Sequence, residues 1–317
     1  MLKIYQADTN MRLEQIDAIK AAIPGDWQFT DAVEGASVIL TESVDITAKL
    51  LSEAGKNLRL ILCMLPGTAK VSDTTVPVEY MYDAGLIGVA EHTVTLILTL
   101  SRHFLQVARQ TRLKEWAPGK DEPIFTDQRK YTYNWIDLPH NDAIYRKKVG
   151  IIGLGFIGRE VVKRLRAFNV QIFYTDLNRF DPAVEKELGV EWRELDDLLK
   201  ECDFISLHLR FVDGPDGNDK MFSTREFELM KSSAYFINTA RGRLVDEDAL
   251  VKALQDGMIA GAGMDVFRYE PLHKDSALLN MAGDNVILSA HVSGTYMPEA
   301  WATTAQEVVE RVQAVIN

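Results

Sequence analysis

The chain has 317 residues and a formal net charge of −11 at pH 7, and 47% of its residues are hydrophobic. This composition is ordinary for a soluble globular protein, and the length favours two domains over one. Because an acidic surface repels nucleic acid and anionic lipid, we expect neither DNA nor a membrane surface as a partner.

The first hundred residues alternate between strand and helix patterns, which predicts a parallel sheet with helical crossovers. The predicted strands cover residues 2–7, 37–41 and 58–63, and the predicted helices cover 11–23 and 46–55. Residues 87 to about 112 then form one long helical pattern that is largely apolar in its first half. A helix that is apolar on most sides is usually buried, often between two domains.

Residues of about 113–147 interrupt this alternation. The segment is rich in proline, tyrosine, tryptophan and charge, and it has no sustained hydrophobic period. It could be a disordered linker, but such linkers are poor in aromatic residues and this segment contains six. We therefore expect an arm that packs against another surface, such as a second subunit.

A second alternation begins at Lys148 and runs almost to the end of the chain. Its strands are predicted at VGIIG (149–153) and VQIFYTD (170–176), and then at DFISLHL, AYFINTA, GAGMDVF and VILSAH. Six strands with helical crossovers are typical of a doubly wound parallel sheet. Residues 298–316 form a final amphipathic helix pattern.

Nothing in the sequence indicates secretion, a membrane span or a metal. The first residues lack the apolar core of a signal peptide, and the most apolar stretch, 84–100, is short and contains Glu91 and His92. Cys63 and Cys202 lie in apolar runs outside any metal-binding pattern, which predicts two reduced, packed thiols. The expected location is the cytoplasm.

A glycine-rich turn follows the first strand of the second alternation. Gly153, Gly155 and Gly158 form the pattern GxGxxG between an apolar strand and a helix. In the dinucleotide-binding fingerprint these glycines permit a tight turn, close approach of a pyrophosphate, and contact between helix and strand. The amides of Phe156 and Ile157 would face the phosphates. The alternative is a glycine turn in an α/β protein that binds no dinucleotide.

Asp176, at the end of the next strand, indicates which dinucleotide binds. It follows Gly158 by 18 residues, and an acid at about that distance accepts hydrogen bonds from the ribose hydroxyls. Because a carboxylate there repels a 2′-phosphate, NAD is favoured over NADP. The nearby Arg179 keeps NADP as the less favoured alternative.

Three charged residues follow later strands of the same predicted sheet. Arg241 comes after AYFINTA, Glu270 after GAGMDVF and His291 after VILSA. Because ligands of such sheets bind beyond the carboxyl ends of the strands, we expect these residues beside the nicotinamide. Each also has a structural alternative: Arg241 and Glu270 could brace two loops as an ion pair, and His291 could be a core histidine.

Four motifs resemble those of the D-isomer-specific 2-hydroxyacid dehydrogenases. They are Val89-Ala-Glu-His92, Asn238-Thr-Ala-Arg-Gly242, Gly263-Met-Asp-Val-Phe267 with Glu270-Pro271, and Ser289-Ala-His-Val-Ser-Gly294. The resemblance extends from about residue 85 to 300, except for the arm. It implies a homodimeric, NAD-dependent D-2-hydroxyacid dehydrogenase (EC 1.1.1.-). Such an enzyme interconverts a 2-keto acid, here of the glyoxylate or hydroxypyruvate type, and a D-2-hydroxy acid by hydride transfer.

The resemblance gives each of the three charged residues a role. Arg241 would bind the substrate carboxylate and polarise the keto oxygen, and a guanidinium fork matches a carboxylate in shape. His291 would act as acid and base at that oxygen, because imidazole ordinarily titrates near neutrality. Glu270 would orient the imidazole by accepting a hydrogen bond from its other nitrogen.

Further contacts are implied by the same resemblance. The residues implied to line the cofactor are Asp265, near the nicotinamide carboxamide, and Thr95, Thr239 and Gly294. The substrate-binding loop of the family corresponds to residues 65–70, with Gly67 and Thr68 as contacts, but it lacks the family's Gly-x-Gly and Asp. Other departures from the family pattern occur at Tyr80, Gly85 and Arg210. The identity of the substrate therefore stays open.

The expected architecture is α/β with two Rossmann-like domains. A smaller flavodoxin-like substrate domain would comprise residues 1–95 and 295–317. An NAD-binding domain with a doubly wound parallel sheet would comprise residues 96–294, and the connections would act as a hinge. Two alternatives to 2-keto acid reduction are an NAD-sensing interaction module on the same fold and a dehydrogenase of a non-carboxylate anion, which Arg241 would also bind.

Overall fold

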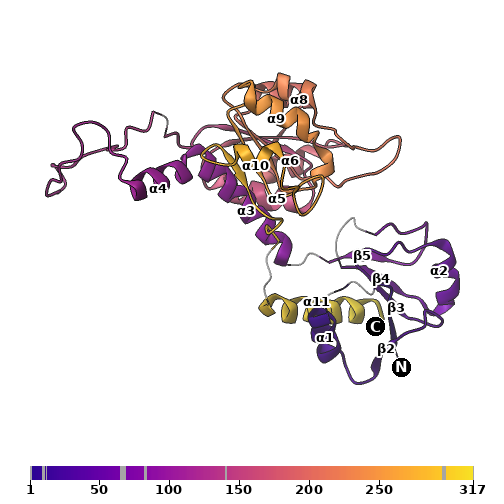
Figure 1. Ribbon diagram of the computed structural model, residues 1–317. Helices are drawn as coiled ribbons and strands as arrows, with labels where there is room; N and C mark the ends of the chain where they lie inside the picture. Colours follow the sequence, from indigo (N-terminus) through magenta and orange to yellow (C-terminus); the bar gives the residue numbers. More distant parts are fainter. Residues whose placement is uncertain are drawn as a thin grey trace. The chain divides into compact units, whose positions relative to one another are not determined.

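Figure 1 shows the computed structural model of the chain, which describes residues 2–8, 11, 13–64, 69–81, 84–139, 141–294 and 298–316. The chain forms two compact units. Unit one comprises Met1–Gly88 and Gly294–Asn317, and unit two comprises Val89–Ser293. Each unit is built on its own parallel β-sheet.

Unit one holds five parallel strands in the order β2-β1-β3-β4-β5, which is the strand order of flavodoxin-like folds. The strands are β1 (Leu2–Gln6), β2 (Trp27–Thr30), β3 (Val38–Thr41), β4 (Leu60–Cys63) and β5 (Val78–Tyr80). The helices are α1 (Leu13–Ala22), α2 (Ala48–Ala54), the short 3-10 helix η1 (Gly55–Asn57) and α11 (Pro298–Ile316). One apolar cluster joins α1 and α11 to the sheet through Ile16, Val308 and Leu40, so the last helix of the chain belongs to the first unit.

Unit two holds seven parallel strands in the order β12-β11-β10-β9-β6-β7-β8. They are β6 (Lys148–Ile152), β7 (Gln171–Thr175), β8 (Glu191–Trp192), β9 (Phe204–Leu207), β10 (Tyr235–Asn238), β11 (Gly261–Met264) and β12 (Val286–Leu288). The strand order reverses between β6 and β9, as in doubly wound dinucleotide-binding sheets. Sheets of this kind bind ligands at the reversal, beyond the carboxyl ends of the strands.

The helices of unit two cover both faces of its sheet, except α4, which has no buried residue and extends away from the sheet (Figure 1). They are α3 (Ala84–Ser101), α4 (Phe104–Leu113), α5 (Phe156–Arg166), α6 (Pro182–Leu188), α7 (Leu195–Glu201), α8 (Thr224–Leu229), η2 (Gly242–Leu244), α9 (Glu247–Gln255) and α10 (Ala277–Met281). One apolar cluster contains Ile97 of α3 and Leu165 of α5, and the other contains Leu198 of α7 and Leu250 of α9. The predicted α/β fold class is confirmed, with one doubly wound sheet and one smaller flavodoxin-like sheet.

The predicted single helix over residues 87–112 is wrong. Helix α3 ends at Ser101 and α4 begins at Phe104, and His103 between them has a φ of +47°. The break contains neither glycine nor proline, so the helical pattern of the sequence continues through it. Strands β2, β5 and β8 and helices α6 and α10 are also absent from the predicted elements. Each has at most seven residues, which is too short to show a clear period.

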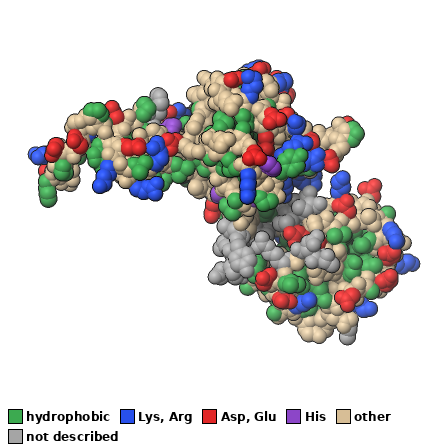
Figure 2. All heavy atoms as spheres, in the orientation of Figure 1, with side chains coloured by type: hydrophobic (Ala, Val, Ile, Leu, Met, Phe, Trp, Pro, Cys, Tyr) green, Lys and Arg blue, Asp and Glu red, His purple; other side chains and the backbone are tan. Residues whose placement is uncertain are grey.

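Residues 114–147, the segment that connects α4 to β6, have no helix or strand at any described position. The rings of Trp116 and Trp135 are 4.5 Å apart, and the amide of Ala117 donates to the carbonyl of Trp135 at 2.8 Å. Other apolar side chains of the segment lie at the surface (Figure 2). Phe125 is 95% exposed. The arm therefore closes on itself at its base and leaves much of its aromatic surface uncovered.

Candidate active site

The glycine-rich turn lies at the carboxyl end of β6, where the strand order reverses. Gly153 has a φ of +95°, and a Cβ atom on it would lie 2.8 Å from the carbonyl oxygen of His208. A Cβ atom on Gly158 would lie 2.3 Å from the carbonyl oxygen of Gly153. The turn therefore needs glycine at both positions, at the first for its backbone conformation and at the second for the close contact of α5 with the turn.

The N-terminus of α5 opens onto free space. Gly155 is its N-cap residue and supplies no side chain to cap the first turn, and a Cβ atom there would meet nothing within 4 Å. The first amides of a helix have no partner inside it, and the helix dipole favours an anion at this end. The start of α5, at Phe156 and Ile157, therefore fits a pyrophosphate.

Asp176 follows β7 and is attached to this turn. Its Oδ2 atom accepts a hydrogen bond from the amide of Leu154 at 2.7 Å, and its Oδ1 atom accepts one from the amide of Leu177 at 2.7 Å. A carboxylate has about four acceptor positions, so two remain for other donors. Asp176 is thus held beside the glycine-rich turn with the capacity to bind hydroxyl groups.

Arg179, which lies near Asp176 in the sequence, forms an ion pair with Glu185. Its Nε and Nη2 atoms donate to the two carboxylate oxygens of Glu185 at 2.8 and 2.9 Å. The hydroxyl of Tyr174 donates to the same carboxylate at 2.9 Å. The Arg179 guanidinium holds the pKa of Glu185 below its usual range. This bidentate ion pair holds the Arg179 side chain against Glu185 of α6.

Arg241 lies three residues after β10, on a loop that a buried asparagine closes. Asn238 accepts from the amide of Ala240 at 2.9 Å and donates to the carbonyl of Arg241 at 3.0 Å. The Arg241 side chain is exposed, and its Nη1 atom donates to the carbonyl of Ala240 at 2.6 Å. Because a guanidinium has five N–H donors, this leaves most of them available to an anion.

Glu270 and His291 form a direct pair. The Nδ1 atom of His291 lies 2.6 Å from Oε2 of Glu270, and Oε1 of Glu270 accepts from the amide of Phe267 at 2.9 Å. The alternative ion pair between Arg241 and Glu270 is not seen among the described residues, because each side chain is bonded elsewhere. With Nδ1 bonded to Glu270, Nε2 of His291 is left to face a substrate, and the imidazole is 47% exposed.

Asp265 is fully buried and holds the loop that carries His291. Its Oδ1 atom accepts from the Ser289 hydroxyl at 2.6 Å and the Val292 amide at 3.0 Å, and its Oδ2 atom accepts from the Ser293 amide at 2.9 Å. Burial of Asp265 favours its neutral form, but the hydrogen bonds from Ser289 and Ser293 outweigh it and hold its pKa below the usual value. The carboxylate is therefore ionised and already engaged with residues 289–293.

The two candidate threonines differ in their surroundings. Thr239 is buried and its hydroxyl lies 2.8 Å from that of Thr93, which donates to the carbonyl of Val89 at 2.8 Å. Because a hydroxyl has one proton, Thr239 must be the donor to Thr93. Thr95 is exposed on α3 and donates to the carbonyl of Glu91 at 2.9 Å.

The loops that carry these residues share one edge of the unit-two sheet. Asn238 pairs with Met264 and Met264 with Leu288, so β10, β11 and β12 end at the same level. Ile152 pairs with Leu207 in the same way at the reversal point. Loops with a nucleotide-binding turn, an arginine and a Glu–His pair thus follow strands that end along one edge.

A comparison with protein families identifies the family to which this chain belongs. The family model described as the NAD-binding domain of D-isomer specific 2-hydroxyacid dehydrogenases matches residues 94–293. The chain belongs to the D-isomer specific 2-hydroxyacid dehydrogenase family. A protein of Staphylococcus aureus strain bovine RF122 that is named as a 2-hydroxyacid dehydrogenase is 34% identical over 299 residues, which cover 88% of this chain and 84% of that protein.

Solved structures of the family have the same fold. The D-lactate dehydrogenase of Aquifex aeolicus, complexed with NAD and lactic acid, is 25% identical with a TM-score of 0.64, over 98% of this chain and 94% of that one. The NAD-complexed enzyme of Lactobacillus delbrueckii ssp. bulgaricus is 22% identical with a TM-score of 0.69, over 99% and 97%. The prediction of a D-2-hydroxyacid dehydrogenase with an NAD-binding domain is therefore confirmed.

Several contacts of this dehydrogenase could not be predicted from its sequence. The imidazole of His92 lies 2.9 Å from the Ser289 hydroxyl, and Thr93 contacts Thr239, although 146 or more residues separate the partners of each pair. The only signal for His92 is its place in the family motif Val89-Ala-Glu-His92. The motif shows that the residue matters but does not name its partner.

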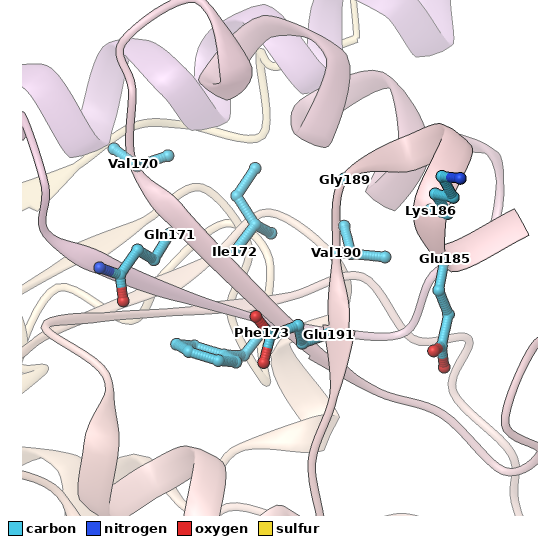
Figure 3. Close-up of a pocket in the computed structure, with 9 residues that line it drawn as sticks. All are labelled: Val170, Gln171, Ile172, Phe173, Glu185, Lys186, Gly189, Val190 and Glu191. Atoms are coloured by element: carbon cyan, nitrogen blue, oxygen red, sulfur yellow. The ribbon is translucent and has the colours of Figure 1, made fainter. Parts of the chain in front are cut away.

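Gly67 and Thr68 are not among the described residues. Gly294, the first residue of unit one after the crossover, is described, and a Cβ atom there would meet nothing within 4 Å. A hollow of about 320 Å³ lies along residues 170–173 and 189–191, at the opposite end of β7 from Asp176 (Figure 3). It is therefore not part of the candidate active site.

The described part of the chain has neither a metal-binding cluster nor a membrane-spanning helix. No group of three or more His, Cys, Asp and Glu side chains is placed there to hold a metal ion. No helix at the described positions combines the length and the apolar character needed to cross a bilayer.

Proposed function

We propose that the enzyme reduces a small 2-keto acid, of the glyoxylate or hydroxypyruvate type, to a D-2-hydroxy acid with NADH, and catalyses the reverse oxidation. The observation that carries this proposal is the 2.6 Å contact between Glu270 and His291 at the carboxyl edge of the unit-two sheet. It leaves one imidazole nitrogen for proton transfer on the edge where a dinucleotide binds.

The chain's own residues supply orientation and the proton. Arg241 holds the substrate carboxylate through its guanidinium fork and draws electron density from the neighbouring keto oxygen. The protonated imidazole of His291 gives its Nε2 proton to that oxygen, and Glu270 stabilises the cation beforehand and keeps the ring in place. NADH, when bound, supplies the hydride that the keto carbon receives. In the reverse direction His291 accepts the hydroxyl proton.

NAD is the proposed dinucleotide rather than NADP. Asp176 lies beside the glycine-rich turn with acceptor positions left for ribose hydroxyls, and its negative charge opposes a 2′-phosphate. Arg179, which would attract such a phosphate, is bonded through two nitrogens to Glu185. The proposed lining of the nicotinamide side comprises Thr95, Thr239, Asp265 and Gly294.

Each unit has a proposed role in the reaction. Residues 96–294 would bind NAD, and residues 1–95 with 295–317 would bind the substrate, with Gly67 and Thr68 as backbone contacts. The connections would act as a hinge whose closure excludes water from the reacting atoms. Two of the family departures, Tyr80 and Gly85, belong to the proposed substrate domain, and Arg210 follows β9.

We propose a cytoplasmic homodimer whose contact includes the arm. Helix α4 has no buried side chain, and Phe125, Tyr131 and Tyr133 of the arm are 95%, 65% and 73% exposed. Apolar surface of this kind is usually covered by a partner. Sedimentation of a Phe125→Ser/Tyr133→Ser variant should show a monomer, and a monomeric wild type would contradict the proposal.

The buried free thiols of Cys63 and Cys202 support a reducing compartment.

The reaction is tested by following NADH and NADPH oxidation with glyoxylate, hydroxypyruvate, pyruvate, and branched and aromatic keto acids. His291→Ala should lower kcat by a factor of about 10² to 10⁴, the usual contribution of a general acid, while NADH still binds. His273→Ala, an exposed histidine beside Asp275, is the matched control and should retain wild-type kcat. Unchanged turnover in His291→Ala would contradict the assigned role, and inactivity of the wild type with every acid would contradict the substrate class.

A further inference from the structure

A chain of hydrogen bonds connects α3 to the loop that carries His291. The Nε2 atom of His92 lies 2.9 Å from Oγ of Ser289, and that hydroxyl lies 2.6 Å from Oδ1 of Asp265. His92 is on α3, whereas Ser289 directly follows β12. The imidazole of His92 is partly exposed, and its Nε2 atom lies 3.7 Å from Oδ1 of the fully buried Asp265. That distance is too long for a hydrogen bond, so the Ser289 hydroxyl is the hydrogen-bonded link between the two side chains.

The direction of each hydrogen bond follows from the ionised carboxylate. Asp265 has a pKa below its usual value, so it is an acceptor and Ser289 must donate to it. The single proton of the Ser289 hydroxyl is then used, and its oxygen can only accept from His92. His92 therefore carries a proton on Nε2 and is a donor in this chain. A side chain without an N–H group at that place would leave the Ser289 oxygen without its donor.

The same carboxylate holds the residues on both sides of His291. Its other hydrogen bonds come from the amides of Val292 and Ser293, and the amide of His291 donates to the main-chain carbonyl of Asp265 at 2.8 Å. His291 has a φ of +53°, a conformation that needs support from its surroundings. The backbone at His291 is thus held by Asp265, and the orientation of Asp265 depends on the Ser289 hydroxyl.

We propose that His92 is a positioning residue for His291 and acts through Ser289 and Asp265. Its N–H group orders the Ser289 hydroxyl, which orients the Asp265 carboxylate, which holds the backbone of residues 291–293. His92 touches neither Glu270 nor the imidazole of His291 within the described contacts, so its effect is on placement and not on the proton itself. The inference rests on the proposed role of His291 as the acid and base of the reaction.

Buried hydrogen bonds of this kind have measurable consequences. Loss of one partner in a low-dielectric network leaves the others without a complete set of bonds, and the network then relaxes. A displacement of a catalytic group by about 1 Å can lower turnover by a factor of about 100. Because Arg241 and the glycine-rich turn lie on other loops, binding of the keto acid and of NADH should change much less than turnover.

The test compares three substitutions that affect the hydrogen bond between His92 and Ser289. His92→Leu removes the donor, His92→Gln keeps an amide N–H at the same number of bonds from Cα, and Ser289→Ala removes the acceptor. We expect kcat to fall about 10- to 100-fold in His92→Leu. We expect KM for the keto acid to stay within about threefold and His92→Gln to recover most of kcat. The double variant His92→Leu/Ser289→Ala should be no slower than Ser289→Ala, because both changes remove the same hydrogen bond.

Ser101→Ala is the matched control, since Ser101 is a buried hydroxyl on the same helix that bonds only to the carbonyl of Leu98 among its described contacts. Its kcat should equal that of the wild type. Equal kcat in His92→Leu and the wild type would overturn the proposal, and so would equal losses in His92→Leu and His92→Gln. If His92→Leu does not fold, Ser289→Ala and the Gln variant decide the same question. The wild type and His291→Ala are measured in parallel to distinguish the two hypotheses. An inactive wild type would contradict the proposed function. An active wild type with an unchanged kcat in His92→Leu would contradict only the proposed role of His92.

Discussion

Gly242 lies so close to Phe267 that a Cβ atom placed on it would come within 1.9 Å of the Phe267 carbonyl carbon. Gly242 directly follows Arg241, and Phe267 donates its amide to Glu270. Because Gly242 has no side chain, the loop that carries Arg241 can pack backbone against backbone with the loop that carries Glu270. The spacing between Arg241, the proposed ligand of the substrate carboxylate, and Glu270, which contacts His291, depends on this contact.

We predict that Gly242→Ala separates these two loops. The new methyl group meets backbone atoms that have no flexible end to move, so the loops themselves must shift. Such overpacking typically costs about 1–3 kcal/mol of the free energy of unfolding. Urea unfolding should show a loss of that size, and kcat/KM for the keto acid should fall by at least about tenfold, since misplaced catalytic groups act poorly.

Gly283→Ala is the control for this substitution. A Cβ atom there would meet its nearest neighbour, the carbonyl oxygen of Met281, at 3.9 Å, which is an ordinary contact. Stability and kcat/KM should stay near wild type in this variant. Equal behaviour of the two variants would show that the contact with Phe267 does not hold the loops.

The glycine-rich turn and the acid beside it could be predicted because their sequence requirements are local. Gly153, Gly155 and Gly158 are spaced by the turn and helix that they form, and the alternation of strands and helices indicates which edge of the sheet they occupy. Asp176 is recognisable because it ends the next strand. Arg241, Glu270 and His291 could be named as candidates for the same reason, since each follows a strand of one parallel sheet.

The contacts that complete the site depend on the tertiary fold. No pattern of residues shows that His92 reaches Ser289, or that Asp265 holds residues 289–293, because these pairs meet only when α3 packs beside β11 and β12. The break at His103 is hidden for a different reason: neither glycine nor proline occurs there to mark the end of a helix, so the helical pattern of the sequence continues through it.

We predict that Asp219→Asn weakens catalysis although Asp219 is not one of the proposed catalytic residues. Its carboxylate accepts from Arg243 at 2.8 Å and from Arg268 at 3.3 Å, and Arg243 holds the pKa of Asp219 below its usual range. Arg243 lies two residues from Arg241 and Arg268 lies two residues from Glu270, so Asp219 bridges the loops that carry these two candidate residues. Steady-state kinetics should show kcat/KM reduced about three- to tenfold, with a urea midpoint near that of the wild type because the pairs are partly exposed.

The control for Asp219 is Asp196→Asn, which breaks the comparable surface pair of Asp196 with Arg225. That pair lies at the starts of α7 and α8, and its described ion pairs include neither Arg243 nor Arg268. Its loss should leave kcat/KM unchanged. If both variants lose activity to the same extent, the bridging role of Asp219 is wrong and general surface electrostatics explains the effect.

We predict that Glu185→Gln increases the use of NADPH. The substitution removes the charge that holds Arg179, whose guanidinium then becomes available to a 2′-phosphate near Asp176. The KM for NADPH should fall several-fold, whereas the KM for NADH should change little. Glu191→Gln, which breaks the pair of Glu191 with Arg193 on β8, is the matched control. An unchanged ratio of the two KM values would mean that Arg179 does not reach the ribose.

The last prediction concerns His208, at the end of β9. Burial lowers its pKa to about 3, and its Nδ1 atom is buried without a hydrogen-bond partner among the described residues. The unfolded chain takes up a proton on this histidine below its ordinary pKa of about 6.5, but the folded protein does not until near pH 3. Stability from this group is therefore complete above about pH 6.5 and is lost as the pH falls from there towards 3.

Replacing this group with a side chain that does not titrate isolates its contribution. Between pH 7 and pH 5 the wild type should lose on the order of 1–2 kcal/mol more of its free energy of unfolding than His208→Gln does. Urea unfolding at both pH values measures the difference. His273→Gln, an exposed histidine, should keep the wild-type pH dependence. Parallel curves for the wild type and His208→Gln would show that His208 is protonated in the folded enzyme at pH 5, and that the end of β9 is open to water.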